Sequence, residues 1–526
     1  MEKRLVIAIA LSILIVLGFQ YMSPKPALPP SGKASSLPAK VEPAKEAEIA
    51  EPVTAGAEEK EAEIETDTLQ LTFSNIGGGI KKIGLKKFTA PNSSENLDLV
   101  SLTNPTEYLL NISSTMYPDL DTTPYSVSRS DGNITYTLKT GELEIIKSYK
   151  LSNSKYGIQL SINVKNLSGA SKPFVYRIIG GAGISEPNNS DKRFVEVTSD
   201  VNGKTFGFKK PKPGQRTTNP GIVGWTALKN KYFSLVLKPF VATESQFYSE
   251  DKHGALTMGI AAEPINIQPN SSIDNKFILY AGPSSIPPLK EVGYGLDATI
   301  NYGFFGGISK VMIVIMGFFH TVTRSWGFSI ILLSIFLNLI TFPLTAKSFK
   351  SMQKMQELHP QMEQLKKQHK DSPEKLNKAV MELYKKYNIN PLSGCLPILL
   401  QMPVFIALYA ALMKSIELRN TGFFWIQDLS SPDAVRLPFS LPLIGNSINI
   451  LPLIMVVAMV MQQKISTKTM GSAVTPEQKE QQKIMLIVMP IVFGFIFYSM
   501  PSGLVLYWVV NTILTIVEQG SMAKNS

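Results

Sequence analysis

The chain has 526 residues, 44% of them hydrophobic, and this length predicts at least two parts because one domain usually holds roughly 100–200 residues. Its single cysteine, Cys395, excludes an intramolecular disulfide and, because it lies far from the start, an N-terminal lipoprotein anchor. The formal charge of +11 reflects local patterning, with lysines crowded into residues 347–386 and an acidic segment before residue 66, so we expect no nucleic-acid partner.

Residues 1–22 combine the basic flank MEKR with the apolar run LVIAIALSILIVLGFQYM. Such a segment is either a cleaved signal or a retained transmembrane anchor. We expect the anchor, because no convincing small-x-small cleavage motif follows and the run is long for the apolar part of a signal, which holds roughly 7–15 residues. The basic flank predicts a cytoplasmic N-terminus with the following residues on the far side of the membrane.

Residues 23–66 are rich in Pro, Ala and Glu, which predicts a disordered linker that buries too little apolar surface to fold. Residues 67–302 change to short runs of alternating polarity, such as LQLTF and YFSLVLKPF, separated by Gly, Asn and Ser. This period of two predicts strands, and we expect an all-β sandwich. The domain has one histidine, His253, and no carboxylate pair that would indicate a hydrolytic or sugar-processing site.

Apolar segments fill the rest of the chain. Residues 303–325 carry Lys310, His320 and Arg324 along an apolar run, which predicts an amphipathic helix at the membrane interface. Because a crossing needs about 20 apolar residues, we expect transmembrane helices at 326–345 and, within 391–519, at 391–413, about 443–463, 484–500 and 503–519. With the anchor they make six crossings, so the short tail 520–526 is cytoplasmic like the N-terminus.

Loop charge gives an independent test of this topology. Residues 346–390 contain ten lysines and residues 464–483 contain four, whereas residues 415–447 carry only Arg419 and Arg436 as basic residues. The positive-inside rule therefore places the lysine-rich loops in the cytoplasm and the β domain on the opposite side.

The loop 346–390 predicts a helical hairpin. A break falls near His359–Pro360, and Ser372–Pro373–Glu374 is typical of a helix start. Apolar residues form one stripe on each arm: Met352, Met355, Met362 and Leu365, then Leu376, Val380, Leu383, Tyr384 and Tyr387. Two interpretations are open, namely contact between the two arms, which we favour, and an adaptable methionine surface for another apolar chain.

Polar residues inside the predicted spans recur at intervals of three and four, which places them on one face of each helix. The three stripes are Ser334, Asn338, Thr341 and Thr345; Gly394, Pro397 and Gln401; and Tyr507, Asn511 and Thr515, with Glu518 one turn further. Such residues either hold helices together or line a shared polar cavity. Three stripes, all toward the cytoplasmic half, favour a cavity that admits water.

Several classes of activity lack their motifs. The sequence has no glycine-rich phosphate loop for ATP-driven transport, and its four histidines are dispersed without a metal-binding pattern. No inverted repeat of a secondary transporter is visible among the spans. We therefore expect neither an enzyme nor a cofactor or metal.

Several stretches are specific enough to indicate a family. WGFSII (326–331), FPLT (342–345), NPLSGCLPILLQMPVFIALY (390–409), QQKIM (481–485) and MPSGLVLYWVVN (500–511) resemble the YidC membrane protein insertases, relatives of the mitochondrial Oxa and chloroplast Albino insertases. The resemblance extends over nearly the whole chain, and the large outer domain is similar to the Gram-negative form of the family.

The resemblance implies a fold and a function. The fold would be six transmembrane helices, five of them forming the insertase core, plus a periplasmic β-supersandwich. The function would be to insert integral inner-membrane proteins and help them fold, alone or beside the Sec translocon. Implied partners are nascent inner-membrane proteins and the lipid bilayer, with the ribosome and the signal recognition pathway as further candidates.

The resemblance and the polar stripes together predict two sets of site residues. A hydrophilic groove open to cytoplasm and lipid would be lined by Ser334, Asn338, Thr341, Gln401 and Asn511, and an apolar exit path by Met402, Phe405, Phe493, Tyr507 and Trp508. One position departs from the family, which commonly has arginine where Asn338 stands. Asparagine can hydrogen-bond a passing chain, but it cannot attract acidic residues by charge.

Two other classes of function remain open from the residues alone. A channel or small-solute transporter would use the same polar spans, and it predicts solute flux through a continuous pore. A periplasmic chaperone or binding β domain on a passive anchor predicts that deletion of residues 67–283 abolishes activity, whereas an insertase would keep most of it.

Overall fold

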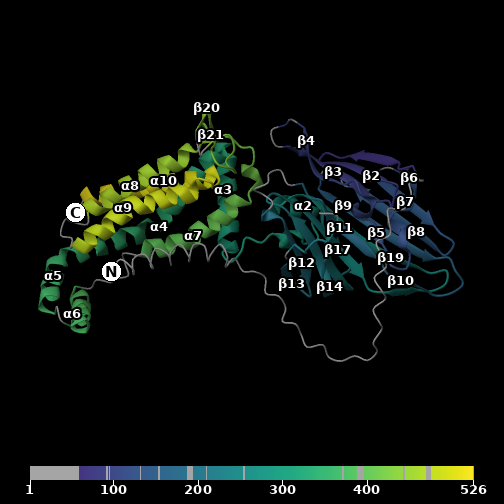
Figure 1. The fold of residues 1–526 in the computed structure, drawn as a ribbon, viewed down its shortest axis with the longest axis horizontal. Helices are drawn as coiled ribbons and strands as arrows, with labels where there is room; N and C mark the ends of the chain where they lie inside the picture. The colour runs from purple at the N-terminus through teal and green to yellow at the C-terminus, as the bar shows by residue number, and fades with distance from the viewer. Residues whose placement is uncertain are drawn as a thin grey trace. The chain divides into compact units, whose positions relative to one another are not determined.

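The computed structural model describes residues 58–524, except 91–92, 94, 131, 152–154, 186–192, 209, 253–254, 370–371, 388–395, 442–444 and 470–475. The predicted anchor at residues 1–22 and most of the predicted linker lie outside the described residues. The chain divides into two compact units, one ending at Ile300 and the other beginning at Asn301 (Figure 1). We call them the β unit and the helical unit.

Strands make up most of the β unit. A four-stranded antiparallel sheet contains β1 (Glu61–Glu65), β2 (Leu69–Ser74), β3 (Ile80–Thr89) and β4 (Asn96–Ser101), in that order. A separate two-stranded sheet pairs β10 (Lys172–Phe174) with β18 (Ile265–Ile267). Short helices are η1 (Pro105–Glu107), η2 (Pro118–Asp121), α2 (Ile286–Val292) and η4 (Leu296–Thr299).

The larger sheet has thirteen strands. They are β5 (Ile112–Ser113), β6 (Ser126–Ser130), β7 (Asn133–Lys139), β8 (Leu143–Leu151), β9 (Gly157–Asn166), β11 (Arg177–Ala182), β12 (Glu196–Val201), β13 (Lys204–Phe208), β14 (Arg216–Lys229), β15 (Phe233–Pro239), β16 (Glu244–Lys252), β17 (Ala255–Ala262) and β19 (Ser272–Pro283). The order is β5–β11–β17–β16–β14–β15–β19–β9–β8–β7–β6, and β12 pairs with both β13 and β14. The prediction of an all-β domain is confirmed.

The predicted end of the linker at residue 66 is wrong, because β1 pairs with β2 in the sheet. Its sequence EAEIE has the acidic, alanine-rich composition of a linker, but Ala62 is buried while Glu61 and Glu65 face outward. Lysines of β3 compensate these charges, with Lys86 Nζ 3.1 Å from a carboxylate oxygen of Glu65. Because these glutamates pair with lysines some 20 residues away, an acidic segment can form the edge strand of the sheet.

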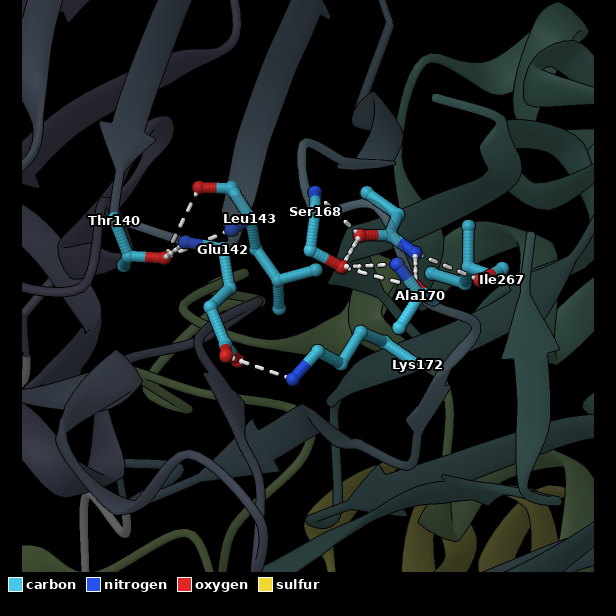
Figure 2. Close-up of polar contacts among 8 residues, drawn as sticks. Thr140, Glu142, Leu143, Ser168, Ala170, Lys172 and Ile267 are labelled. Atoms are coloured by element: carbon cyan, nitrogen blue, oxygen red, sulfur yellow. Dashed lines mark hydrogen bonds and ion pairs between the residues drawn. The ribbon is translucent and has the colours of Figure 1, made fainter. Parts of the chain in front are cut away.

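Asn166 is a buried polar side chain of the β unit that has hydrogen-bond partners within the unit. Asn166 at the end of β9 is fully buried, and its Nδ2 donates to the carbonyls of Ala170 (2.8 Å) and Ile267 (2.9 Å). Figure 2 shows this contact beside the turn from Thr140 to Leu143 and the ion pair between Lys172 and Glu142. The amide therefore joins β9 to β18, and this pairing offsets the cost of burial.

The most deeply buried charged residue of the β unit is Lys147 on β8. Its Nζ donates to the carbonyls of Gly77 (2.9 Å) and Gly78 (2.8 Å), and Tyr149 donates to the same Gly78 oxygen. Gly77 and Gly78 adopt φ +64° and +62°, which L side chains rarely adopt, and this conformation aims both carbonyls at the lysine. Desolvation lowers the pKa of Lys147 well below its ordinary value and raises the pKa of Tyr149.

The helical unit contains the apolar helices. In chain order, the elements of this unit are α3 (Gly306–Thr323), α4 (Trp326–Glu357), α5 (His359–Gln368), α6 (Pro373–Lys386), α7 (Leu396–Met413), η6 (Ile416–Leu418), β20 (Val435–Leu441), β21 (Gly445–Ile448), α8 (Ile450–Thr469), α9 (Pro476–Phe497) and α10 (Ser502–Lys524). Among the described residues, three helical stretches are long and apolar enough to cross a membrane: Gly306–Thr323, Trp326–Ser351 and Ser502–Met522. Shorter apolar stretches are Gln401–Met413, Ile450–Ser466 and Leu486–Phe497.

Some predicted helix boundaries differ from the structure. Helix α4 contains Pro343 and continues from the predicted end at residue 345 to Glu357, because residues 346–357 contain no proline or glycine that would end it. The span predicted from residue 443 starts only at Ile450, because Gly445–Ile448 forms β21 and pairs with β20. Helix α3 is long and apolar enough to cross a membrane, so length and composition do not distinguish it from a span. Its position at the membrane interface remains a prediction.

The predicted hairpin is present as α5 and α6. The break before His359 and the start of α6 at Pro373 are confirmed. Leu358 and Tyr384 are buried between the arms and pack with Met362, Val380 and Leu383, as the favoured interpretation requires. Burial also raises the pKa of Tyr384. The side chains of Met352 and Met355 lie outside the described residues.

Candidate functional site

The helices of the helical unit form a bundle. Helix α4 packs against α3 and α10, α10 against α8, α8 against α9, and α7 against α3, α4 and α10. Figure 1 shows the α5–α6 hairpin at one end of this bundle and the β20–β21 hairpin at the other. We refer to them as the α5–α6 end and the β20–β21 end.

Burial along the helices is concentrated at the β20–β21 end. In α4, α7, α8 and α10 the buried apolar residues near this end include Ile330, Leu333, Leu408, Leu412, Leu451, Met455, Leu504 and Val505. Farther along the same helices, toward the α5–α6 end, lie the exposed residues Leu339, Ile340, Met402, Val457, Met461, Ile513 and Val517. Because α7 runs in the opposite direction to α4, α8 and α10, the gradient belongs to a place in the bundle and not to chain order.

The loop between α7 and β20 seals the β20–β21 end. Leu418, Phe423, Ile426 and Leu429 are buried in the core that the helices form there. Backbone hydrogen bonds tie this loop to the start of α10, from Ser502 N to the carbonyl of Ser431 (2.8 Å) and from Gly503 N to the carbonyl of Leu429 (2.9 Å). The loop therefore packs over the β20–β21 end of the core that the helices form.

Two buried polar side chains fix the same loop to α8 and α9. Asp433 accepts from the backbone N–H of Leu451 (2.8 Å) and from Trp425 Nε1 (3.3 Å). Asn449 accepts from the N–H of Ala434 (2.8 Å) and donates to the carbonyl of Tyr498 (2.6 Å). Sequence reasoning missed this seal, although the run DLSSPD at 428–433 is typical of turns.

Ser334, a predicted groove residue, lies in the packed half of α4. Its exposed fraction is 0%, and its hydroxyl donates to the carbonyl of Ile330 at 2.8 Å in its own helix. This placement differs from the prediction, because a side chain without exposed surface contributes to helix packing and not to the lining of a groove. Thr341 is half-buried and donates to the carbonyls of Leu337 and Asn338.

Asn338 and Asn511 are half-buried on α4 and α10, which pack against each other. Within the described part of the chain, neither side-chain amide has a hydrogen-bond partner, whereas Asn166 and Asn449 elsewhere are paired. An unsatisfied polar group in hydrocarbon costs several kcal/mol. These two amides therefore require water or the polar groups of another molecule.

Gln401 and Tyr507 join α7 to α10. Gln401 Nε2 donates to the Tyr507 hydroxyl at 2.7 Å, and Tyr507 has an exposed fraction of only 1%. A predicted groove residue and a predicted exit residue thus form one partly buried pair. Tyr507 contributes through this contact and not through an exposed face.

Three predicted exit residues come together in one aromatic cluster. The Trp508 ring lies 5.1 Å from Phe405 and 5.8 Å from Phe493, measured between ring centroids. Phe497, one turn after Phe493, completes the cluster at 5.2 Å from Trp508 and was missed by sequence reasoning. Met402 is 43% exposed on α7, three residues before Phe405. The cluster joins α7, α9 and α10.

Comparison with known proteins covers both units. A family model described as 60Kd inner membrane protein matches residues 318–526, and a second, YidC periplasmic domain, matches residues 61–315. The membrane protein insertase YidC of Citrifermentans bemidjiense is 34% identical over 552 residues, which cover 99% of this chain and 98% of that protein. The chain belongs to the YidC family of membrane protein insertases. The YidC protein of Geobacter sulfurreducens is 33% identical, with 99% and 98% covered.

Family membership assigns each of the two units to a cellular location. The helical unit is the membrane region of a multi-pass inner-membrane protein of the YidC family, and the β unit is its periplasmic domain. A crystal structure titled active YidC insertase with the first transmembrane domain resolved aligns over 98% of this chain and 99% of its own, at 17% identity and a TM-score of 0.34. The assignment rests on the sequence matches alone.

Proposed function

We propose that the chain inserts nascent inner-membrane proteins through a hydrated groove at the α5–α6 end of the bundle, open to cytoplasm and lipid and closed at the β20–β21 end. Of the predicted lining, Asn338, Thr341, Gln401 and Asn511 belong to this groove, and Ser334 supports it from the packed side. Insertion would occur alone or beside the Sec translocon, with the ribosome and the signal recognition pathway as candidate partners.

The observation that carries this proposal is the difference between the two ends of the helix bundle. One end is covered by Leu418, Phe423, Ile426 and Leu429 of the loop before β20, whereas the other half leaves the amides of Asn338 and Asn511 unsatisfied within the described chain. A continuous solute channel would need a polar path through both ends. A half-open groove instead lowers the cost of moving a hydrophilic segment partway across the membrane.

The driving force would be transfer of the substrate's apolar segment into lipid. Burial of apolar surface contributes about 25 cal/mol per Å², and the membrane potential acts on charges in the translocated segment. We propose that the aromatic cluster of Phe405, Phe493 and Trp508, with Met402 at its exposed side, forms the exit path. The faces of the three rings are apolar and offer a moving apolar helix mainly non-directional contacts, which need not be broken one by one.

The proposed orientation follows from charge. Lys350, Lys354, Lys375 and Lys385 are exposed at the α5–α6 end, and the positive-inside rule favours the cytoplasm for that end. Helix α10 ends there at Lys524, so the C-terminus would be cytoplasmic. The predicted anchor at residues 1–22 would place the N-terminus on the same side.

The test is insertion of a small single-span protein into liposomes that contain the purified chain without ATP, scored by protease protection. We expect protection with wild type, a clear loss with Asn338→Leu, and retention or gain with Asn338→Arg, because position 338 would act through polarity. Asn377→Leu makes the same change at an exposed position of α6 and serves as the matched control.

Each outcome decides something different. Protection equal to that of empty liposomes would overturn autonomous insertion and favour an accessory chaperone role. Equal activity in wild type, Asn338→Leu and Asn338→Arg would mean that Asn338 contributes only to helix packing. Loss of activity in the Asn377→Leu control would show that the assay responds to apolar substitution in general.

A further inference from the structure

The polar face of α10 ends in a carboxylate that the groove described above does not use. Tyr507, Asn511, Thr515 and Glu518 follow one another at intervals of four, four and three residues, which places them on one helix face. Tyr507 accepts a hydrogen bond from Gln401 of α7, so this face points into the bundle. Glu518 is half-buried at the α5–α6 end of that face.

Charged neighbours do not compensate Glu518. Among the described residues it has no ion pair, although lysines surround this end of the bundle. Lys347, Lys350 and Lys354 of α4 are exposed, as is Lys464 of α8. The adjacent Gln519 accepts a hydrogen bond from Ser466 of α8, and this contact leaves Glu518 on a different side of the helix. A half-buried carboxylate without a counter-ion is costly and indicates an external cation.

We propose that Glu518 is a specificity-determining residue that binds the basic flank of an incoming apolar segment at the cytoplasmic mouth of the groove. This inference rests on the function proposed above. Membrane proteins keep an excess of Lys and Arg next to the cytoplasmic ends of their spans. Such a flank reaches the α5–α6 end first, and there Glu518 supplies the attraction.

The surrounding charge makes this attraction selective. The lysine-rich hairpin repels a basic flank, whereas the assigned groove residues Asn338, Thr341, Gln401 and Asn511 are neutral. Glu518 is therefore the acidic group on this polar face that holds a lysine or arginine flank in place while the apolar segment moves into lipid. An acidic flank would be repelled at this position and retained by the hairpin lysines instead.

The test uses the full-length chain in liposomes with three single-span substrates that differ only in the cytoplasmic flank, which carries two Lys, two Gln or two Glu. We expect wild type to protect the Lys-flanked substrate about 1.4- to 5-fold better than the Gln-flanked one, the range for an ion pair in contact with water. Glu518→Gln should remove this preference, and Glu518→Lys should transfer it to the Glu-flanked substrate. Glu382→Gln, an equal change of net charge on the exposed face of α6, should preserve it.

The Gln-flanked substrate separates the possible failures. Insertion of this substrate by both Glu518 variants above the level of empty liposomes shows that the variants are folded. If wild type inserts it but shows no flank preference, or if Glu518→Gln keeps the preference, Glu518 is only a solvated helix-end residue and the inference is overturned. If wild type inserts none of the substrates above empty liposomes, the proposed function itself fails, and the inference fails with it.

Discussion

Lys147 in the β unit and Asn338 in the helical unit are polar side chains on regular elements whose neighbours are largely apolar. Lys147 is fully buried, and two carbonyls accept from its Nζ at 2.9 and 2.8 Å. Asn338 is half-buried, and its amide has no partner within the described chain. The β unit thus compensates its buried polar group internally, whereas the helical unit leaves one to be satisfied from outside.

This difference indicates that the polar group of Lys147 stabilises the fold, whereas the polar group of Asn338 is available for function. The carbonyls of Gly77 and Gly78 face Lys147 because both glycines have positive φ, so removal of the lysine leaves the Gly77 carbonyl without this donor and the Gly78 carbonyl with Tyr149 alone. Removal of the Asn338 amide breaks no hydrogen bond to a described residue. Parallel polar-to-apolar substitutions in the two units should therefore have opposite consequences for stability and for insertion.

The largest effect on stability is expected for Lys147→Met. Methionine fills a similar volume, but it leaves the carbonyl of Gly77 without its donor, and an unsatisfied buried group costs about 1–3 kcal/mol. With loss of the second bond to Gly78, we expect about 3 kcal/mol less stability for the β unit. Since 1 kcal/mol corresponds to about 2–4 °C for a domain of 150–250 residues, calorimetry of the full chain in detergent should show its transition about 6–12 °C lower.

Lys276→Met is the matched control for that substitution, because Lys276 lies in the same sheet on β19, which is separated from β8 by β9, and its side chain is exposed. Its transition should stay within about 0.5 kcal/mol of wild type. Faster amide exchange around Gly77 and Gly78 in Lys147→Met alone would locate the defect. An unchanged transition for Lys147→Met would contradict the view that Lys147 is structural.

The second prediction concerns pH. The folded state lowers the pKa of Lys147, so between that value and the ordinary lysine pKa of about 10.5 the unfolded chain binds one more proton. Stability of the β unit should therefore rise with pH in this window, by up to about 1.4 kcal/mol per pH unit. Burial raises the pKa of Tyr136 and Tyr149, which reverses the trend only above the ordinary tyrosine pKa of about 10.

Calorimetry of wild type and Lys147→Met from neutral pH to just below pH 10 isolates this contribution. The difference in stability between the two proteins should widen as pH rises. A difference that stays constant over the range would mean that Lys147 has the same protonation state in the folded and unfolded chains.

The strands of the β unit were predictable because alternation is a local property. In β8, residues Leu143, Ile145, Lys147 and Tyr149 are buried at every second position, as period-two reasoning requires. The partners of Lys147 lie 69 and 70 residues earlier in the chain, so no local pattern indicates them. Strand β1 was taken for linker for the same reason, because its glutamates pair with lysines of another strand.

In the helical unit, the sequence period predicts which residues share a helix face, but it does not predict how far each residue lies from the sealed end of the bundle. Ser334 and Asn338 share a face of α4, yet Ser334 lies where the loop before β20 seals the bundle and Asn338 lies beyond it. The resemblance to YidC insertases supplied Phe405 and Trp508, which do meet, but not Phe497. Which end of a bundle is closed depends on a loop that folds back, and the stripes of the helices carry no such information.

A smaller effect is expected for Tyr507→Phe, which deletes the hydroxyl that accepts from Gln401 at 2.7 Å. Hydrogen bonds between membrane helices contribute about 0.6 kcal/mol on average in double-mutant cycles. We expect a coupling of about that size between Tyr507→Phe and Gln401→Leu, measured by unfolding in detergent micelles. Insertion should persist in Tyr507→Phe, because the ring keeps its place in the packed core; a loss as large as that of Asn338→Leu would assign the hydroxyl to the groove.

The smallest effect on stability is expected for Asn338→Leu, the counterpart of Lys147→Met. No hydrogen bond to a described residue is lost, and leucine suits a half-buried position facing lipid or other helices, so the free energy of unfolding should change by less than about 0.5 kcal/mol. Insertion should nevertheless fall. Unfolding and liposome insertion measured on the same preparation give both values. If Asn338→Leu were as destabilising as Lys147→Met, the amide would have a hydrogen-bond partner within the protein in the membrane. Asn338 would then stabilise the helix bundle, and it would no longer support a half-open groove.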